Sequence, residues 1–188
     1  VRDLDGVSGA QYFGRGIEAG IAQASGRAVY WYLSVRADHV ERHGGPSHPL
    51  SVLQQVIAPF HAPFRALVDA TPSEDIRFEP LLVRDALAPW GDGPVTLLGD
   101  AAHPMLPHAG QGAAQALEDA VALGRRTSPD RPVSPRLRDY EHVRQARTMT
   151  VAAVARRNAR MGSVDGALNC AARDLVLRLI PQRVVLKA

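Results

Sequence analysis

Residues 99–120 read GDAAHPMLPHAGQGAAQALEDA, and they say more about the fold than any other part of the chain. The run before them, residues 95–98, is apolar without alternation and predicts a short strand covered on both faces. Asp100 follows at the predicted carboxyl end of that strand, where ligands bind in open α/β sheets. Small and apolar residues then recur at helical spacing over residues 112–124. The stretch therefore predicts a strand, a loop and a helix that together contact a ligand.

The predicted loop contains groups suited to a ligand that carries both hydroxyls and developing negative charge. Gly99 leaves room for close approach to the backbone, and the Asp100 carboxylate accepts hydrogen bonds from hydroxyls. Gly110 and Gly112 flank the start of the predicted helix, whose unpaired N–H groups and macrodipole favour an anion or a polarised carbonyl. A flavin presents both features, because its ribityl chain carries hydroxyls and its N1–C2=O edge becomes negative on reduction.

The N-terminal part of the chain is predicted to be mainly β. Residues 1–45 read as β, and residues 29–35 alternate between two unlike faces. A turn signal at Ser25-Gly26 separates them from a weaker extended segment at residues 17–21, which predicts a hairpin. Residues 76–84 are also predicted to be extended.

Helices are predicted in the middle and at the C-terminal end. Apolar residues at three- and four-residue steps from Leu50 to Leu67 predict a helix interrupted near Pro59 and Pro63. Two further helices are predicted over about residues 137–160 and 171–180. We predict three functional segments: part of a substrate-binding sheet and helix (1–84), a cofactor motif (85–124) and C-terminal helices (125–188).

Composition places the chain among ordinary globular proteins. Of its 188 residues, 46% are hydrophobic and 22% charged, which argues against disorder throughout. No apolar run approaches the roughly 18 residues of a membrane span, and the N-terminus lacks a secretory signal. Cys170 is the single cysteine, so an intrachain disulfide is excluded and we expect a cytoplasmic protein. Because the first residue is not Met, we expect part of a longer gene product.

Basic and acidic residues are distributed unevenly along the chain, but this distribution does not identify a binding partner. Up to Gly124 it has 8 Arg against 14 acids, and beyond it 14 basic residues against 5 acids. A basic C-terminal part is compatible with nucleic-acid binding, but no aromatic residues are interleaved for base stacking. We therefore expect no nucleic-acid partner and interpret these arginines as a solvated helix face: Arg144, Arg147, Arg156, Arg157, Arg160, Arg173 and Arg178.

The quoted stretch resembles the second FAD-binding motif of the class A flavoprotein monooxygenases, typified by p-hydroxybenzoate hydroxylase and salicylate hydroxylase. The shared pattern is Gly-Asp-Ala-Ala-His-Pro, then Pro, then Gly-Gln-Gly. Flanking residues resemble the same family in the same order: Gly14-Arg15-Gly16, Val29-Tyr30-Trp31, Trp90-Gly91, Tyr140-Glu141 with Arg144 and Arg147, and Arg173-Asp174 with Leu177-Arg178 and Pro181. The resemblance implies the α/β (α+β) fold of the C-terminal part of such an enzyme. It also implies an antiparallel substrate-domain sheet, a flavin-site strand and C-terminal helices.

The resemblance also implies cofactors and site residues. The cofactors are FAD and NAD(P)H, and the predicted FAD-binding residues are Gly99, Asp100, Pro107, Gly110, Gln111, Gly112, Ala113 and Ala114. Asp100 would accept a hydrogen bond from a ribityl hydroxyl. The backbone after Gln111 would face the pyrimidine edge of the isoalloxazine, and Pro107 would lie beside the flavin where substrate binds. The family usually has Asn where this chain has Ala114, so a side-chain contact is lost there.

Two further family motifs are missing from the chain. It has neither the Gly-x-Gly-x-x-Gly βαβ unit that holds the ADP part of FAD nor the middle Asp-Gly motif. We therefore predict the C-terminal part of an FAD-dependent monooxygenase that hydroxylates an aromatic or similarly flat small molecule with NAD(P)H and oxygen. The alternative is a truncated, non-catalytic interaction module that does not hold FAD by itself. The resemblance assigns no catalytic base, and a homo-oligomer is left open.

Several of the residues singled out also have structural interpretations. His103 and His108 are potential metal ligands with Asp100, but the loop is broken by prolines, so we expect no metal and assign His103 to hydrogen bonds that fix the loop. The aromatic residues at 30–32 either line a substrate pocket or belong to the core.

Overall fold

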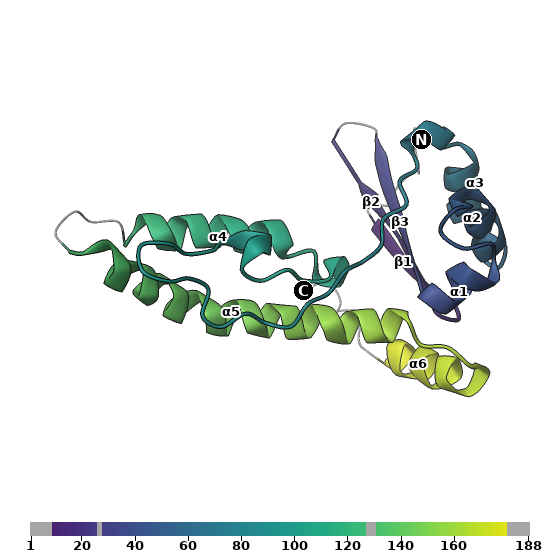
Figure 1. Ribbon diagram of the computed structural model, residues 1–188. Coiled ribbons are helices and arrows are strands. Elements are labelled where there is room, and N and C mark those ends of the chain that lie inside the picture. The colour runs from purple at the N-terminus through teal and green to yellow at the C-terminus, as the bar shows by residue number, and fades with distance from the viewer. Residues whose placement is uncertain (1–8, 26–27, 127–130, 180–188) are drawn as a thin grey trace. The chain divides into compact units, whose positions relative to one another are not determined.

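The computed structural model describes residues 9–25, 28–126 and 131–179 (Figure 1). The chain divides into two compact units, one formed by Val1–Glu79 with Met161–Ala188 and the other by Pro80–Arg160. Each has its own cluster of buried apolar residues. The predicted mixture of an antiparallel sheet and helices is confirmed, whereas the division into three functional segments stays a prediction.

The first unit contains a three-stranded antiparallel sheet. Its strands are β1 (Gly9–Phe13), β2 (Ile17–Gln23) and β3 (Val29–Val35), in the order β1-β2-β3. Gly20 pairs with Gln11 on one side and Tyr32 on the other. The predicted hairpin of β2 and β3 is therefore confirmed; Gly26, in its predicted turn, lies outside the described residues.

Three short helices cover one face of this sheet (Figure 1): α1 (Ala37–Arg42), α2 (Pro49–Ile57) and α3 (Ala62–Asp69). The predicted interruption near Pro59 is confirmed, because α2 ends at Ile57 and α3 begins with Pro63 in its first turn, where its missing N–H costs no helical bond. The expectation of β structure throughout residues 1–45 is wrong, since α1 follows directly after β3.

Strand alternation gives the sheet one buried face. Ile17, Ala19 and Ile21 of β2 are buried and pack in one cluster with Phe64 of α3. Trp31 packs edge-on against Phe64 with ring centroids 5.9 Å apart. Its indole N–H donates to Thr71 Oγ1 at 2.9 Å. Trp31 therefore belongs to the core.

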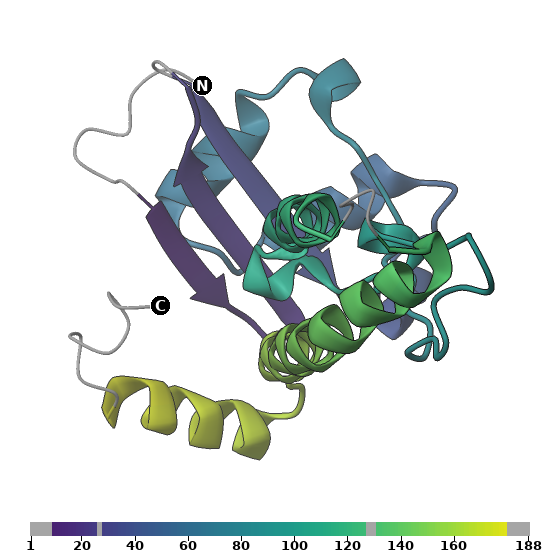
Figure 2. The same ribbon diagram turned by 90° about the vertical axis from the view of Figure 1, so that its left-hand side faces the viewer.

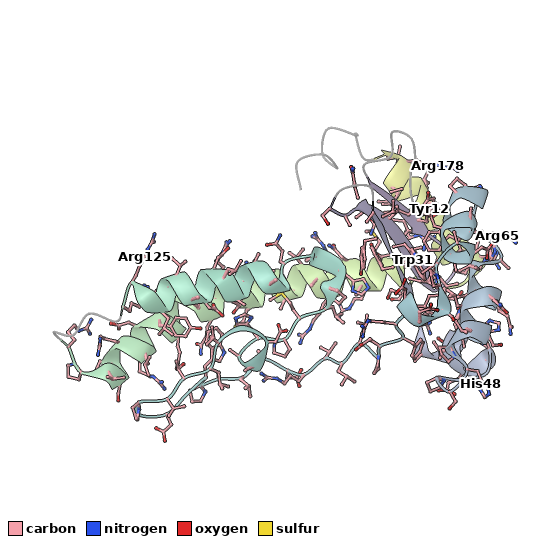
Figure 3. All side chains as sticks on the ribbon, turned by 90° about the horizontal axis from the view of Figure 1, so that it is seen from above. Tyr12, Trp31, His48, Arg65, Arg125 and Arg178 are labelled. Carbon is pink, nitrogen blue, oxygen red and sulfur yellow. The ribbon has the colours of Figure 1, made fainter. Side chains whose placement is uncertain are left out.

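The second unit is built mainly from two long helices that lie side by side (Figures 1 and 3), α4 (Gly112–Gly124) and most of α5 (Val133–Gly162). Both helices were expected, and α5 begins about one turn earlier than predicted. Trp90, Ala102 and Tyr140 form the centre of its small core.

Residues 95–98 do not form the predicted strand. They are not hydrogen-bonded as a strand, and Val95 and Leu98 are 62% and 41% exposed. A strand exists only where a neighbouring segment supplies the ladder of hydrogen bonds. The Leu97 N–H instead donates to the Trp90 carbonyl at 3.2 Å. Residues 76–84 likewise form no strand in the structure.

The last described helix, α6 (Ala167–Leu179), belongs to the first unit and is seen most clearly in Figure 2. It confirms the predicted C-terminal helix and begins four residues earlier, after Gly166, whose φ of 83° is in the left-handed region. Within the described ranges, no helix has both the length and the apolarity needed to cross a bilayer.

Replacing Phe64 tests the core of the first unit. Phe64 is fully buried and its ring contacts those of Tyr12, Trp31 and Phe60. We expect Phe64→Ala to lower the free energy of unfolding by about 3–5 kcal/mol in urea denaturation, because a cavity remains. The exposed neighbour Arg65 is the control, and Arg65→Ala should change it by about 0.5 kcal/mol or less (Figure 3). Equal effects of the two substitutions would contradict this packing.

Candidate functional site

The first part of the candidate site is a tight turn that leaves Asp100 exposed. Gly99 has a φ of 58°, a left-handed conformation that favours glycine, and begins a single 3₁₀ turn, Gly99–Ala101. Its carbonyl accepts from the N–H groups of Ala102 and His103, both at 2.9 Å. A Cβ at Gly99 would lie 3.3 Å from the Cβ of Ala116, so this turn lies close against α4. Asp100 is exposed beside that contact.

The second part is the beginning of α4. Gly110 has a φ of 61°, and its N–H donates to the Pro107 carbonyl at 2.8 Å, which closes a turn just before the helix. No side chain caps the helix at Gln111. A Cβ at Gly110 or Gly112 would meet no atom within 4 Å. The first N–H groups of α4 have no intrahelical acceptor, and Pro107, Gln111, Ala113 and Ala114 are exposed at this end of the helix.

A buried carboxylate holds these two parts together. Asp119 of α4 is fully buried and accepts from the Gly99 N–H at 2.8 Å. His103 Nε2 lies 2.5 Å from the same oxygen, and it must donate because a carboxylate only accepts. Arg144 Nε of α5 donates to the other Asp119 oxygen at 2.6 Å. The predicted role of His103 in fixing the loop is confirmed.

Arg144 extends this contact into a network between α4 and α5. It is buried, and its Nη1 donates to Glu118 at 2.6 Å. Its Nη2 donates to Gln115 Oε1 at 2.8 Å. Arg147 also donates twice to Glu118, at 2.5 and 2.7 Å. A solvated face was therefore the wrong interpretation for Arg144, because the acceptors on α4 replace water around its guanidinium.

The interpretation as a solvated helix face is also wrong for Arg173 of α6. It too is buried, and Nη1 donates to the Gly14 carbonyl at 2.9 Å. Arg147, Arg157, Arg160 and Arg178 are exposed, as expected. Arg156 is half-buried and donates to the Arg84 carbonyl at 3.0 Å.

The network lowers the pKa values of its two carboxyl groups. Hydrogen bonds from Arg147 and Arg144 lower the pKa of Glu118 from 4.5 to about 2. Burial raises the pKa of Asp119, but the hydrogen bonds from the Gly99 N–H, Arg144 and His103 outweigh it and the pKa is lowered. Both groups are therefore ionised at neutral pH, and their two negative charges balance the positive charges of Arg144 and Arg147.

Sequence reasoning missed Gln115, Glu118 and Asp119, although they lie in the quoted stretch. A signal was present: they are the polar positions of an otherwise small and apolar helix, and Glu118 and Asp119 follow Gln115 by three and four residues, which places both beside it on the helix surface. The arginines of the following helix, three residues apart, carry the complementary charges. Neither pattern alone shows that the two faces meet.

The structure does not gather Asp100, His103 and His108 into a metal site. Asp100 is exposed, His103 bonds to Asp119, and the described residues contain a single group of His, Cys or acidic side chains at ligand spacing, elsewhere in the chain. That group is Asp38, His39 and Asp165. Its members already form ion pairs, Asp38 with Arg36 at 2.8 Å and His39 with Asp165 at 3.1 Å.

Acid titration tests the network. Because folding lowers the pKa of Glu118 from 4.5 to about 2, its contribution to stability is present above about pH 4.5 and is lost as the pH falls towards 2. In urea denaturation between pH 2.5 and 7, Glu118→Gln should lower stability at pH 7 and flatten the decline below pH 4.5. Exposed Glu79, which has no ion pair with another described residue, is the matched control, and Glu79→Gln should keep the native profile. The same decline in all three proteins would contradict the network.

Comparison with known proteins shows which family the chain resembles. The family model described as FAD binding domain matches residues 23–155. The aurachin C monooxygenase/isomerase of Stigmatella aurantiaca is 33% identical over 173 residues, which cover 91% of this chain and 44% of that protein. The 6-hydroxynicotinate 3-monooxygenase of Bordetella bronchiseptica is 48% identical over 73 residues, 39% of this chain and 18% of that protein.

Solved structures share the fold. Klebsiella pneumoniae HpxO complexed with FAD and uric acid is 24% identical with a TM-score of 0.77, over 94% of this chain and 45% of that one. The chain thus spans less than half the length of the proteins it matches. Since the family model matches well over half of its residues, the chain belongs to the FAD binding domain family, and its predicted relationship to the flavoprotein monooxygenases is confirmed.

Proposed function

We propose that this chain supplies part of the FAD site of a monooxygenase. The Asp100 carboxylate accepts a hydrogen bond from a ribityl hydroxyl, and the N–H groups of Gly112, Ala113 and Ala114 donate to the pyrimidine edge of the isoalloxazine. Gly99 and the loop with Pro107, Gly110 and Gln111 leave space for the ring system. Bound FAD would supply the redox and oxygen chemistry of the reaction.

The observation that carries this proposal is the Asp119 contact. Gly99 and His103 on the loop, and Arg144 on α5, all donate to one buried carboxylate of α4. An acceptor at Asp100 and a donor group at the start of α4 therefore belong to one tightly bonded assembly. Such preorganisation stabilises a developing charge without reorganising the protein during the reaction.

The helix N-terminus provides the electrostatic part of the proposed site. Unpaired N–H groups and the positive end of the macrodipole stabilise the negative charge that appears at N1–C2=O on reduction. Ala114 offers only its backbone here, so the flavin receives no side-chain hydrogen bond at that position. Glu118 and Asp119 lie further along α4, where Arg144 and Arg147 neutralise them.

We further propose NAD(P)H as the reductant and an aromatic or similarly flat small molecule as the substrate. Relatives named for 6-hydroxynicotinate and 3-hydroxybenzoate support a flat aromatic substrate. The face of the sheet that points away from Trp31 and the helices also supports a flat aromatic substrate. Tyr30 is 58% exposed there, and Gln11 donates to Glu18 at 2.6 Å.

Tyr32 gives that face a fixed aromatic surface. Its ring lies on Gly20, where a Cβ would approach Tyr32 Cε1 to 2.2 Å, and its hydroxyl donates to Glu18 at 3.1 Å. Burial and the Glu18 carboxylate raise the pKa of Tyr32 to about 12, so the phenol stays neutral. We assign this face to the substrate.

The second candidate is an interaction module that does not hold FAD. The observation behind it is that residues 1–188 contain no Gly-x-Gly-x-x-Gly motif for the ADP part of FAD. One measurement separates the two candidates. The product of the whole gene is tested for NAD(P)H oxidation and oxygen uptake that depend on an added aromatic compound, and only the monooxygenase should show them. Their absence in a protein that retains FAD would contradict the monooxygenase.

Replacing Asp100 tests the flavin site. In the whole gene product, Asp100→Ala should weaken FAD binding about 5- to 150-fold, as expected for a lost hydrogen bond to a charged group. The dissociation constant is measured by quenching of flavin fluorescence. Exposed Asp92 is the control, and Asp92→Ala should leave the constant unchanged. Unaltered affinity in Asp100→Ala would remove Asp100 from the site.

The isolated 188-residue chain provides a separate test of whether these residues hold FAD by themselves. We expect it to bind FAD weakly or not at all, because it lacks the Gly-rich βαβ motif. The measurement is flavin retained after desalting. Stoichiometric retention would contradict this expectation and exclude the interaction module as the alternative.

A further inference from the structure

We propose that the first unit carries a second ligand site, for an aromatic anion such as a carboxylate or sulfonate. The site is a cavity of about 720 Å³, a volume typical of small-molecule pockets. It lies among the ends of β1 and β2 and the helices α1, α2 and α6. None of its lining residues belongs to those assigned to FAD.

One side of the cavity is an apolar wall. Ile17 and Val56 are buried members of the core cluster, and Phe60 packs against that cluster. The Phe60 ring lies 5.4 Å from that of Phe64, which fixes its orientation. Phe13 completes the wall on the β1 side. A wall of this kind favours an aromatic or hydrocarbon body, whose burial removes apolar surface from water.

The other side carries a fixed cation, Arg173. Its side chain is 5% exposed and its guanidinium lies 5.4 Å from the centre of the Phe13 ring. It donates to the Gly14 carbonyl through Nη1 and to Asp174 Oδ1 through Nε, each at 2.9 Å, and its Nη2 lies 2.9 Å from the same oxygen in an ion pair. These contacts use at most three of the five N–H groups of the guanidinium. These contacts hold Arg173 in place before a ligand arrives.

A second cation, Arg15, makes the net charge of the cavity lining positive. Asp174 is the single carboxylate in the lining and already pairs with Arg173. Arg15 stands in the turn between β1 and β2 and forms no ion pair with another described residue. His39 and His43 also line the cavity and add no negative charge. The lining therefore has an excess of positive charge beside an apolar wall, which selects an apolar anion over a neutral or cationic molecule.

The probe for this site is 8-anilinonaphthalene-1-sulfonate, an aromatic anion whose fluorescence rises on binding. We expect saturable one-to-one binding to the folded chain and competition by 2-naphthoate but not by neutral 2-naphthalenemethanol. Arg15→Glu should weaken binding about tenfold, through lost attraction and added repulsion. Arg65→Glu, an equal charge change at an exposed position outside the lining, should leave it unchanged. Equal affinities in these two variants, or equal competition by the neutral compound, would overturn the proposal.

A pair of substitutions on α6 tests the location independently of charge. Ala171 lines the cavity, whereas its neighbour Ala172 is exposed outside the lining. Ala171→Trp should place an indole ring in part of the cavity and weaken probe binding, and Ala172→Trp should not. Thermal unfolding shows whether both variants remain folded, since the probe also binds partly unfolded protein. Equal probe affinity in Ala171→Trp and Ala172→Trp, with both proteins folded, would overturn the site.

The same assay separates this site from the flavin site. In the whole gene product, saturating FAD and Asp100→Ala should both leave probe affinity unchanged. Displacement of the probe by FAD, with weaker binding in Asp100→Ala, would assign the probe to the flavin site and overturn the proposal. Failure of FAD binding with intact probe binding would contradict the proposed function alone.

Discussion

The buried carboxylate of Asp119 is the contact on which the arrangement of the candidate flavin site depends. Taking a carboxylate out of water costs several kcal/mol, and the cost is offset only if its oxygens are satisfied. Asp119 meets this condition with donors from three places: the Gly99 N–H, the His103 ring and the Arg144 guanidinium. Removing any one of them would leave an unbalanced polar group inside the second unit. The loop can therefore keep its glycine turn and its exposed Asp100 without a sheet strand before it.

The two units rely on different physical forces. The first has an apolar core in which one face of the sheet packs on short helices, with Phe64 at the centre of an aromatic cluster. The second has only a small apolar core, and its two long helices are joined by charged and polar groups centred on Arg144. Ion pairs within a fixed network orient groups well, because their hydrogen bonds are directional. Such orientation is what a cofactor contact requires.

The first unit presents distinct chemistry in two places. The sheet face opposite the helices is polar and aromatic, with Tyr32 held on Gly20 and bonded to Glu18. The cavity beside α6 combines an apolar wall with Arg173 and with Arg15, which has no ion pair among the residues that the structure describes. Both surfaces are built on residues that belong to the core or are fixed by it. A rigid sheet thus positions recognition groups that a loop alone would leave mobile.

The sequence alone determined the local elements and the chemistry of the motif. Alternation over residues 29–35, helical spacing over residues 112–124 and the glycines of the loop are properties of neighbouring residues, and each was predicted correctly. Three features depended on the tertiary structure: the burial of Arg144, the Asp119 contact and the absence of a strand at residues 95–98. The physical reason is the same in each case. Burial, an ion pair and a strand each need a partner distant in sequence, and a local pattern does not identify that partner.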